Sequence, residues 1–180
     1  MHGVMIVLLG MPGCGKSTLA RSLAAESGQP WYDTDARLQD RFGDILGPRP
    51  GPEDWRRYRE LEHGLIRELA QKSDGCLSLG GGSWQVTETR QLLLSRHNCV
   101  YLRCDPGVLS KRLAGGKRVM FADGNITQLL SALLREREPD YLLAHHTVDV
   151  SNRSEKDLLA TLRALAVAPA FVQRSEANAF

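Results

Sequence analysis

The sequence predicts a three-layer α/β fold in which a mostly parallel, five-stranded sheet is flanked by helices. Segments typical of strands and of helices alternate along the chain, which is the order expected of such a fold. The first strand-like segment, "VMIVLL" at 4–9, is apolar throughout, as strands buried on both faces of a parallel sheet are. The 180 residues, 42% of them hydrophobic, suffice for a sizeable core, and we predict a single domain over residues 1–180.

Each predicted strand is a short apolar run bounded by turn residues or polar residues. After the first, the predicted strands are "PWYDTD" at 30–35, "GCLSL" at 75–79, "CVYLRC" at 99–104 and "TVDV" at 147–150. In a doubly wound sheet, residues that follow the carboxyl ends of neighbouring strands share one edge, where ligands bind.

The predicted helices follow from apolar residues at helical spacing. A helix runs from Lys16 and stops at Gly28, a plausible C-terminal cap. A long amphipathic helix starts at Trp55 and belongs to a substrate-binding helical segment over about 36–72. A later helix, which starts at Ile126, is expected to end at Pro139.

Three segments lack regular periodicity. Residues 47–54 contain many prolines and glycines and are expected to form an irregular loop. Residues 114–125 are expected to form a mobile lid, and residues 168–180 a frayed tail.

The composition fits a small enzyme of the cytoplasm. The net charge of +2 gives no reason to expect nucleic acid or a membrane surface as a partner, and we expect a monomer. No apolar stretch approaches the roughly 20 residues that span a bilayer, and we find no export signal at the N-terminus. The four cysteines form no close metal-binding or redox pair and are expected to be free thiols.

A glycine-rich segment between the first strand and the first helix predicts a phosphate site. Gly10, Gly15, Lys16 and Ser17 fit the pattern G-x-x-x-x-G-K-[ST], with a further glycine at Gly13. Glycine lets backbone amides approach an anion, and the following helix directs its positive end at the same place.

The polar residues of this segment have distinct predicted roles. Lys16 supplies a positive charge for the β- and γ-phosphates of a nucleotide, and the Ser17 hydroxyl can ligate Mg²⁺. Thr18 is a candidate contact to the α-phosphate. The alternative is a glycine-rich turn that binds nothing; the strand before it and the helix after it favour a nucleoside triphosphate.

Two acidic residues end the second predicted strand. Asp33 and Asp35 are two positions apart, so in a strand both side chains would point to one face. One could help to hold Mg²⁺ through water, and the other could accept a hydrogen bond from a substrate hydroxyl. In the alternative interpretation Asp35 only caps the helix that follows.

Two arginines and a run of glycines are further candidates. The glycines at 80–82 follow a predicted strand, where a close approach to a ligand or a flexible turn would both suit them. Arg59 has Glu62 one helical turn away, and Arg137 stands where a helix is expected to break. Two arginines in one cleft would bind a small carboxylate, although a solvated ion pair is the usual role of such residues.

Together these motifs resemble those of the shikimate kinase family. The corresponding segments are "GMPGCGKST", "DTD" at 33–35, "YRELE" at 58–62, "GGG" at 80–82, "KRVMF" at 117–121 and "REPDY" at 137–141. Their order and rough spacing agree over most of the chain. The phosphate loop is shared with many enzymes, whereas its combination with the later motifs is much more selective.

The resemblance implies a P-loop kinase fold and ATP-dependent phosphorylation of the 3-hydroxyl of shikimate. By match to the family motifs, shikimate would be bound by Asp35, Arg59, Gly81, Gly82 and Arg137, with both arginines on its carboxylate. Asp35 would also orient or deprotonate the attacking hydroxyl.

The resemblance also assigns residues to ATP and Mg²⁺. Lys16 would stabilise the transferring phosphoryl group, and Arg118 would close over the phosphates from the lid. The Mg²⁺ ion would be served by Ser17 and Asp33, and the adenine would pack against Arg112 and Arg153.

Some residues depart from the family pattern. Val119 follows the lid arginine where the family usually has proline, and "DW" at 54–55 replaces a G-E pair. Trp84 adds a bulky ring next to the glycines, either as packing or as a ligand contact. Another small-metabolite or nucleoside-monophosphate kinase, or a nucleotide-binding protein that has lost catalysis, therefore remains an alternative.

Overall fold

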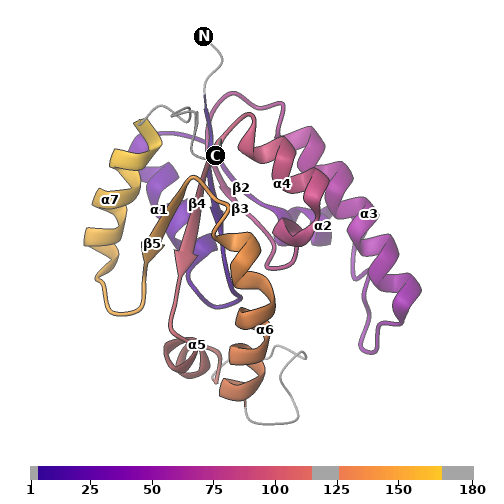
Figure 1. Cartoon of the computed structure of the whole chain (residues 1–180). Helices are drawn as coiled ribbons and strands as arrows, with labels where there is room; N and C mark the ends of the chain where they lie inside the picture. Colours follow the sequence, from indigo (N-terminus) through magenta and orange to yellow (C-terminus); the bar gives the residue numbers. More distant parts are fainter. Residues whose placement is uncertain (1–3, 115–125, 168–180) are drawn as a thin grey trace, which may run out of the picture.

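The computed structural model of the chain describes residues 4–114 and 126–167. Its centre is a five-stranded parallel sheet with the strand order β2-β3-β1-β4-β5 (Figure 1). The strands are β1 (Ile6–Leu9), β2 (Trp31–Asp33), β3 (Cys76–Ser78), β4 (Asn98–Arg103) and β5 (His146–Asp149). This confirms the predicted five-stranded parallel sheet, and the strand bounds differ from the predicted ones by at most two residues.

The central strand explains why the first apolar run is continuous. All four residues of β1 are buried, and β1 pairs with β3 on one side and with β4 on the other. Ile6, for example, lies opposite Cys76 and Asn98. A strand covered on both faces has no solvated side, so polar residues would lose their hydration at every position.

Helices cover both faces of the sheet. They are α1 (Lys16–Ser27), α2 (Thr34–Phe42), α3 (Pro52–Leu69), the 3₁₀ turn η1 (Ser83–Gln85), α4 (Thr87–Leu94), α5 (Pro106–Leu113), α6 (Ile126–Tyr141) and α7 (Glu155–Val167). Helices α1 and α7 lie side by side on one side of the sheet, and α3, α4 and α6 lie on the other (Figure 1). The predicted three layers are therefore confirmed.

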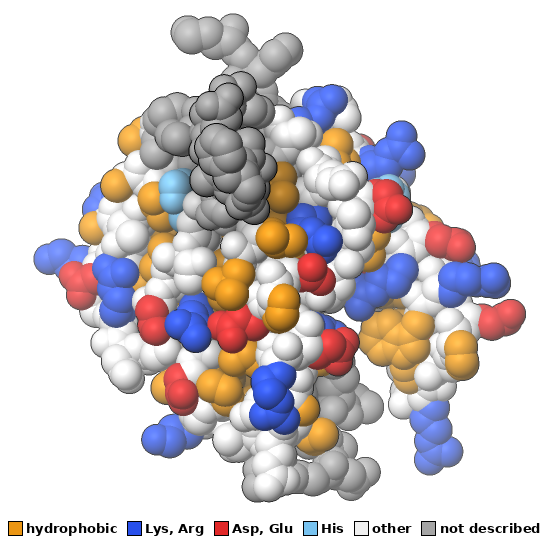
Figure 2. All heavy atoms as spheres, in the orientation of Figure 1, with side chains coloured by type: hydrophobic (Ala, Val, Ile, Leu, Met, Phe, Trp, Pro, Cys, Tyr) orange, Lys and Arg blue, Asp and Glu red, His pale blue; other side chains and the backbone are white. Residues whose placement is uncertain are grey.

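Buried aliphatic side chains hold these layers together. Leu23 of α1 and Leu162 of α7 are buried on one face, and Ile66 of α3 and Leu93 of α4 are buried on the other. Outside, acidic and basic side chains are interspersed on the face that Figure 2 shows. Within residues 4–114 and 126–167, every helix is too short or too polar to cross a membrane.

The ends of two predicted helices illustrate how local chemistry sets a boundary. Helix α1 ends as predicted, because Gly28 adopts a left-handed conformation with φ of 64° and caps it. Helix α3 begins at Pro52, inside the segment 47–54 that was predicted to be irregular. Proline fits the first helical position, and Asp54 Oδ2 accepts a hydrogen bond of 2.8 Å from the Gly51 amide.

The prediction that Pro139 ends its helix is wrong. Helix α6 continues through Pro139 to Tyr141, and the Leu142 amide still bonds to the Glu138 carbonyl at 2.9 Å. Proline has no N–H group to donate to the Arg135 carbonyl. The loss of this one hydrogen bond is tolerated near the end of a helix whose last residue is firmly packed. Tyr141 is fully buried there.

The predicted lid and tail lie almost wholly outside the described residues. Ala114 follows α5 directly, whereas residues 115–125 and 168–180 are not described. Arg118 and Val119 therefore lie outside the described residues, and their roles stay predictions.

The strand order places the functional edge. From β1 the chain moves outward to β2, returns to β3 and then crosses to β4 on the other side of β1. Such a reversal opens a crevice beyond the carboxyl ends of the strands, where the segments after β1, β2 and β3 meet.

Candidate active site

The segment between β1 and α1 forms an anion-binding loop. Gly10, Gly13 and Gly15 have φ of 138°, 82° and 98°, values that side-chain-bearing residues rarely adopt. Gly15 is the N-cap of α1 and has no side chain that could accept hydrogen bonds from the first amides of the helix. These amides therefore remain directed at the loop. Loop amides and a helix N-terminus together favour a phosphate group.

Two of these glycines are also required by packing. A Cβ atom at Gly10 would lie 2.7 Å from the Leu102 carbonyl oxygen of β4. One at Gly13 would lie 2.9 Å from the Leu113 side chain of α5. The loop is therefore fixed against β4 and α5, which holds its amides in place before any ligand binds.

Lys16 lies over the same loop. Its Nζ donates to the carbonyl oxygens of Gly10 at 3.0 Å and Met11 at 2.9 Å, and the residue is buried. An ammonium held this way brings a full positive charge to the loop at little further entropic cost.

Oxygen atoms gather beside Lys16 at the carboxyl ends of β2 and β3. Ser17 Oγ donates to Asp33 Oδ2 at 2.6 Å and lies 3.1 Å from Ser78 Oγ. Asp33 also caps α2, because its Oδ1 accepts from the Ala36 amide at 3.0 Å. Hydroxyl and carboxylate oxygens are the ligands that Mg²⁺ prefers, and this ion commonly completes its shell with water and phosphate oxygens.

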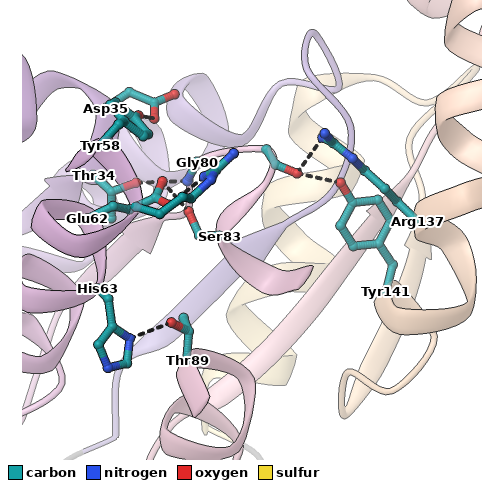
Figure 3. Close-up of polar contacts among 12 residues, drawn as sticks. Thr34, Asp35, Tyr58, Glu62, His63, Gly80, Ser83, Thr89, Arg137 and Tyr141 are labelled. Atoms are coloured by element: carbon teal, nitrogen blue, oxygen red, sulfur yellow. Dashed lines mark hydrogen bonds and ion pairs between the residues drawn. The ribbon is translucent and has the colours of Figure 1, made fainter. Parts of the chain in front are cut away.

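The acidic pair of the "DTD" segment is divided between two elements. The prediction that both carboxylates point from one strand face is wrong, because β2 ends at Asp33 and Asp35 lies in the first turn of α2. The capping residue is Asp33, which removes the alternative that Asp35 serves as the cap. Asp35 Oδ1 instead accepts a hydrogen bond of 3.1 Å from the hydroxyl of Tyr58 on α3 (Figure 3).

Arg59 is held by a buried carboxylate. Its guanidinium pairs with Glu62 Oε2 at 2.5 Å, and Glu62 Oε1 accepts from Ser83 Oγ at 2.6 Å. Burial raises the pKa of Glu62, while the charge of Arg59 and the Ser83 hydrogen bond oppose that rise. The guanidinium also lies 5.8 Å from the centre of the Trp55 ring and 5.4 Å from that of Tyr58.

The polar ends of neighbouring side chains lie close to the glycines after β3, so a larger residue there would displace them. A Cβ at Gly80 would lie 2.7 Å from Asp35 Oδ1 and 2.8 Å from Glu62 Oε1. One at Gly82 would overlap the guanidinium of Arg59. The Gly80 amide donates to Thr34 Oγ1 at 2.8 Å, which ties this loop to the start of α2.

Helix α6 reaches the same loop from the other side. Arg137 donates through a terminal nitrogen to the Gly81 carbonyl at 3.0 Å, and the Tyr141 hydroxyl donates to the same oxygen at 2.7 Å (Figure 3). Among the described residues, the buried Nε of Arg137 has no hydrogen-bond partner. A guanidinium with an unused donor is well suited to an anionic ligand.

One cleft of about 660 Å³ brings most of the predicted residues together. Of these, the cleft is lined by Gly13, Gly15, Lys16, Ser17, Thr18, Asp35, Arg59, Gly81, Gly82 and Arg137. We call the 10–18 loop with Asp33 and Ser78 the phosphate half. The acceptor half comprises Asp35, Tyr58, Arg59, Glu62, the glycines at 80–82 and Arg137.

Several lining residues escaped the sequence analysis as ligand contacts. They are Pro12, Leu46, Trp55, Tyr58, Ser78 and Leu79. Tyr58 was in a quoted motif, and Trp55 was noted as the start of a helix and as a departure from the family. Leu46 comes just before the proline-rich segment, where no periodicity points to a role.

Arg112 and Arg153 lie outside the residues that line this cleft. Arg112 donates to the Val150 carbonyl at 3.2 Å, next to the end of β5. Arg153 donates to Thr161 Oγ1 at 2.7 Å and to the Asp157 carbonyl at 3.2 Å, at the start of α7. Their predicted role with adenine stays a prediction.

Trp84 is packing rather than cleft lining. The ring is fully buried, and its Nε1 donates to the Asp140 carbonyl at 2.7 Å. Arg90 reinforces this contact, since it donates to the Trp84 carbonyl at 2.8 Å and pairs with Asp140 Oδ1 at 3.4 Å. Trp84 therefore connects η1 to the end of α6.

Comparison with known proteins decides the family. The shikimate kinase family model matches residues 12–166. The chain belongs to the shikimate kinase family. A shikimate kinase from Pelotomaculum thermopropionicum is 33% identical over 150 residues, which are 83% of this chain and 87% of that protein.

Solved structures agree with this family. The shikimate kinase from Acinetobacter baumannii in complex with shikimate has a TM-score of 0.81 and 28% identity, and the match covers 92% of this chain and 94% of that one. A gluconokinase from Sinorhizobium meliloti has a TM-score of 0.60 at 19% identity, with 92% of both chains covered. The second likeness concerns the fold alone, so the fold is compatible with more than one acceptor.

Proposed function

We propose that this enzyme transfers the γ-phosphoryl group of ATP to the 3-hydroxyl of shikimate, giving shikimate 3-phosphate and ADP. The observation that carries the proposal is the single cleft that joins an anion-binding loop to one carboxylate and two arginines. Membership of the shikimate kinase family supports the choice of acceptor.

In the phosphate half, the chain binds and holds the nucleotide. The loop amides and Lys16 contact the β- and γ-phosphates, and Thr18 contacts the α-phosphate. Ser17 and Asp33 hold Mg²⁺, Asp33 through water; when bound, the ion neutralises charge on the phosphate oxygens. Arg118 adds a positive charge from the lid, and Arg112 and Arg153 pack against the adenine.

In the acceptor half, the chain orients the alcohol. Arg59 and Arg137 bind the shikimate carboxylate through paired hydrogen bonds, and the backbone at Gly81 and Gly82 lies close to the ring. Asp35 accepts the proton of the 3-hydroxyl as that oxygen attacks. Because little covalent chemistry falls to the protein in phosphoryl transfer, this positioning accounts for most of the rate.

A coupled assay of ADP release tests the proposal. The purified chain with ATP and Mg²⁺ is offered shikimate, gluconate, AMP or CMP in parallel, and we expect turnover with shikimate well above the others. A strong signal with AMP or CMP and none with shikimate would reject the proposal in favour of a nucleotide kinase. ATP binding by calorimetry without turnover of any acceptor would indicate a protein that has lost catalysis. We further propose that the enzyme acts as a monomer in the cytoplasm, without nucleic-acid or membrane partners.

A further inference from the structure

Tyr58 makes a contact that the proposed reaction does not yet use. Its hydroxyl donates to Asp35 Oδ1 at 3.1 Å, across the gap between α3 and the first turn of α2 (Figure 3). Tyr58 and Asp35 both line the cleft, so this hydrogen bond joins two residues of its wall.

The Tyr58 ring is held in place, and its hydroxyl is a lasting donor. The ring meets that of Trp55 edge to face with 6.0 Å between centres, and the Arg59 guanidinium lies 5.4 Å from its centre. Burial raises the pKa of Tyr58, and the neighbouring carboxylates of Asp35 and Glu62 raise it further. The phenol therefore stays protonated and keeps donating at any pH at which the enzyme works.

The Asp35 carboxylate has few other restraints. The residue is exposed, and among the described residues no other group donates a hydrogen bond to it. Gly80 lies directly beneath it, since a Cβ there would come within 2.7 Å of Oδ1. Oδ1 thus bonds to the Tyr58 hydroxyl and lies over Gly80, where a larger residue would leave it no room, and Oδ2 is available to another donor.

We propose that Tyr58 is a positioning residue, whose hydroxyl occupies Oδ1 of Asp35 and so presents Oδ2 to the acceptor alcohol. This inference rests on the proposed role of Asp35 in the reaction. Without the hydroxyl, the exposed carboxylate rotates among several orientations, of which only some accept the proton of the attacking oxygen. The loss then falls on the chemical step, because the groups that bind the acceptor are unchanged.

Replacing Tyr58 by phenylalanine removes the hydroxyl and keeps the ring. For Tyr58→Phe we expect kcat with shikimate to fall about tenfold, with KM for shikimate and for ATP changed by less than about twofold. The matched control is Tyr32→Phe, which removes a phenol hydroxyl on β2, outside the cleft lining, and should leave kcat unchanged. Tyr58→Leu also removes the ring, and we expect it to raise KM for shikimate as well.

A double-mutant cycle separates positioning from a general structural effect. If Tyr58 acts only through the Asp35 carboxylate, Tyr58→Phe has no further effect on the residual turnover of Asp35→Asn, measured with radiolabelled ATP over long incubations. A further tenfold fall in the double variant would overturn the inference, as would an unchanged or increased kcat in Tyr58→Phe alone. Circular dichroism melting of each variant identifies any loss that comes from unfolding.

The outcomes also distinguish this inference from the proposed function. If the unaltered chain does not phosphorylate shikimate, the proposed function fails and this inference fails with it. Shikimate turnover that depends on Asp35 but is indifferent to Tyr58→Phe rejects only the role of Tyr58.

Discussion

In the phosphate half of the cleft, most residues that would meet the triphosphate are consecutive, from Gly10 to Thr18, in the loop after β1 and the first turn of α1. In the acceptor half, the corresponding residues come from α2, α3, the loop after β3 and α6. The first half depends on backbone amides whose directions are fixed by glycine conformations and by packing against β4 and α5. The second depends on side chains that hold one another, such as Arg59, Glu62 and Ser83.

This difference indicates that the binding of the acceptor can be altered without altering the binding of the nucleotide. A backbone cradle that binds phosphate is shared by many enzymes, since it reads only charge and shape. A set of mutually bonded side chains can be changed one residue at a time, and each change should leave the phosphate half intact. Variants of the acceptor half therefore test whether the two halves are separate in function as they are in construction.

The largest effect is expected for Asp35→Asn. The amide cannot accept the proton of the attacking hydroxyl, so kcat should fall about a thousandfold, within the range typical of general acid–base groups. ATP affinity, measured by calorimetry, should change by less than about twofold, because Asp35 lies outside the phosphate half. The matched control is Asp40→Asn on the exposed side of the same helix, which should keep full turnover. Undiminished turnover in Asp35→Asn would remove Asp35 from the chemistry.

A smaller effect is expected for Arg137→Ala. The change removes a guanidinium that lines the cleft and bonds to the Gly81 carbonyl at 3.0 Å. We expect shikimate binding to weaken by about 2 kcal/mol or more, roughly 30-fold in KM, as for the loss of a charge-assisted hydrogen bond. KM for ATP should stay the same.

The control for this variant is available on the same helix. Arg135 is exposed and does not line the cleft, so Arg135→Ala should leave both KM values unchanged. If KM for shikimate is equally unmoved in Arg137→Ala, then Arg137 serves only to hold the loop after β3, and the acceptor carboxylate binds elsewhere.

The same division explains how much the sequence could predict. The five parallel strands follow from apolar runs, and the structure confirms them. The phosphate loop follows from a contiguous pattern of residues, and its binding of phosphate stays a prediction. The position of Asp35 was wrongly predicted, because the chain turns from β2 into α2 within one residue of Asp33. Such a short transition leaves no periodicity in the sequence. It is fixed by the hydrogen bond from the Ala36 amide to the Asp33 side chain, which only the structure shows.

Contacts between distant segments could not be predicted from the sequence for a different reason. Tyr58 meets Asp35 across 23 positions, and Tyr141 meets the Gly81 carbonyl across 60. Helical spacing shows that Tyr58 has an inward-facing neighbour in Glu62, but it does not show which segment that face meets. Arg59 and Glu62 could be paired in advance because both lie on one helix, one turn apart.

The smallest effect is expected for Trp84→Phe, which tests the border of the acceptor half. Trp84 lies next to the glycines in sequence, yet it is fully buried and donates to the Asp140 carbonyl instead of lining the cleft. Loss of that donor and of part of the ring should lower the free energy of unfolding by about 1–3 kcal/mol, seen in urea denaturation. KM for shikimate should change less than about threefold, because the contact stabilises the end of α6 without touching the ligand space. Trp31→Phe, at a partly exposed ring on the edge strand β2, is the matched control and should cost much less stability. A more than tenfold rise in KM at unchanged stability would instead place Trp84 in the acceptor half, whose boundary would then reach η1.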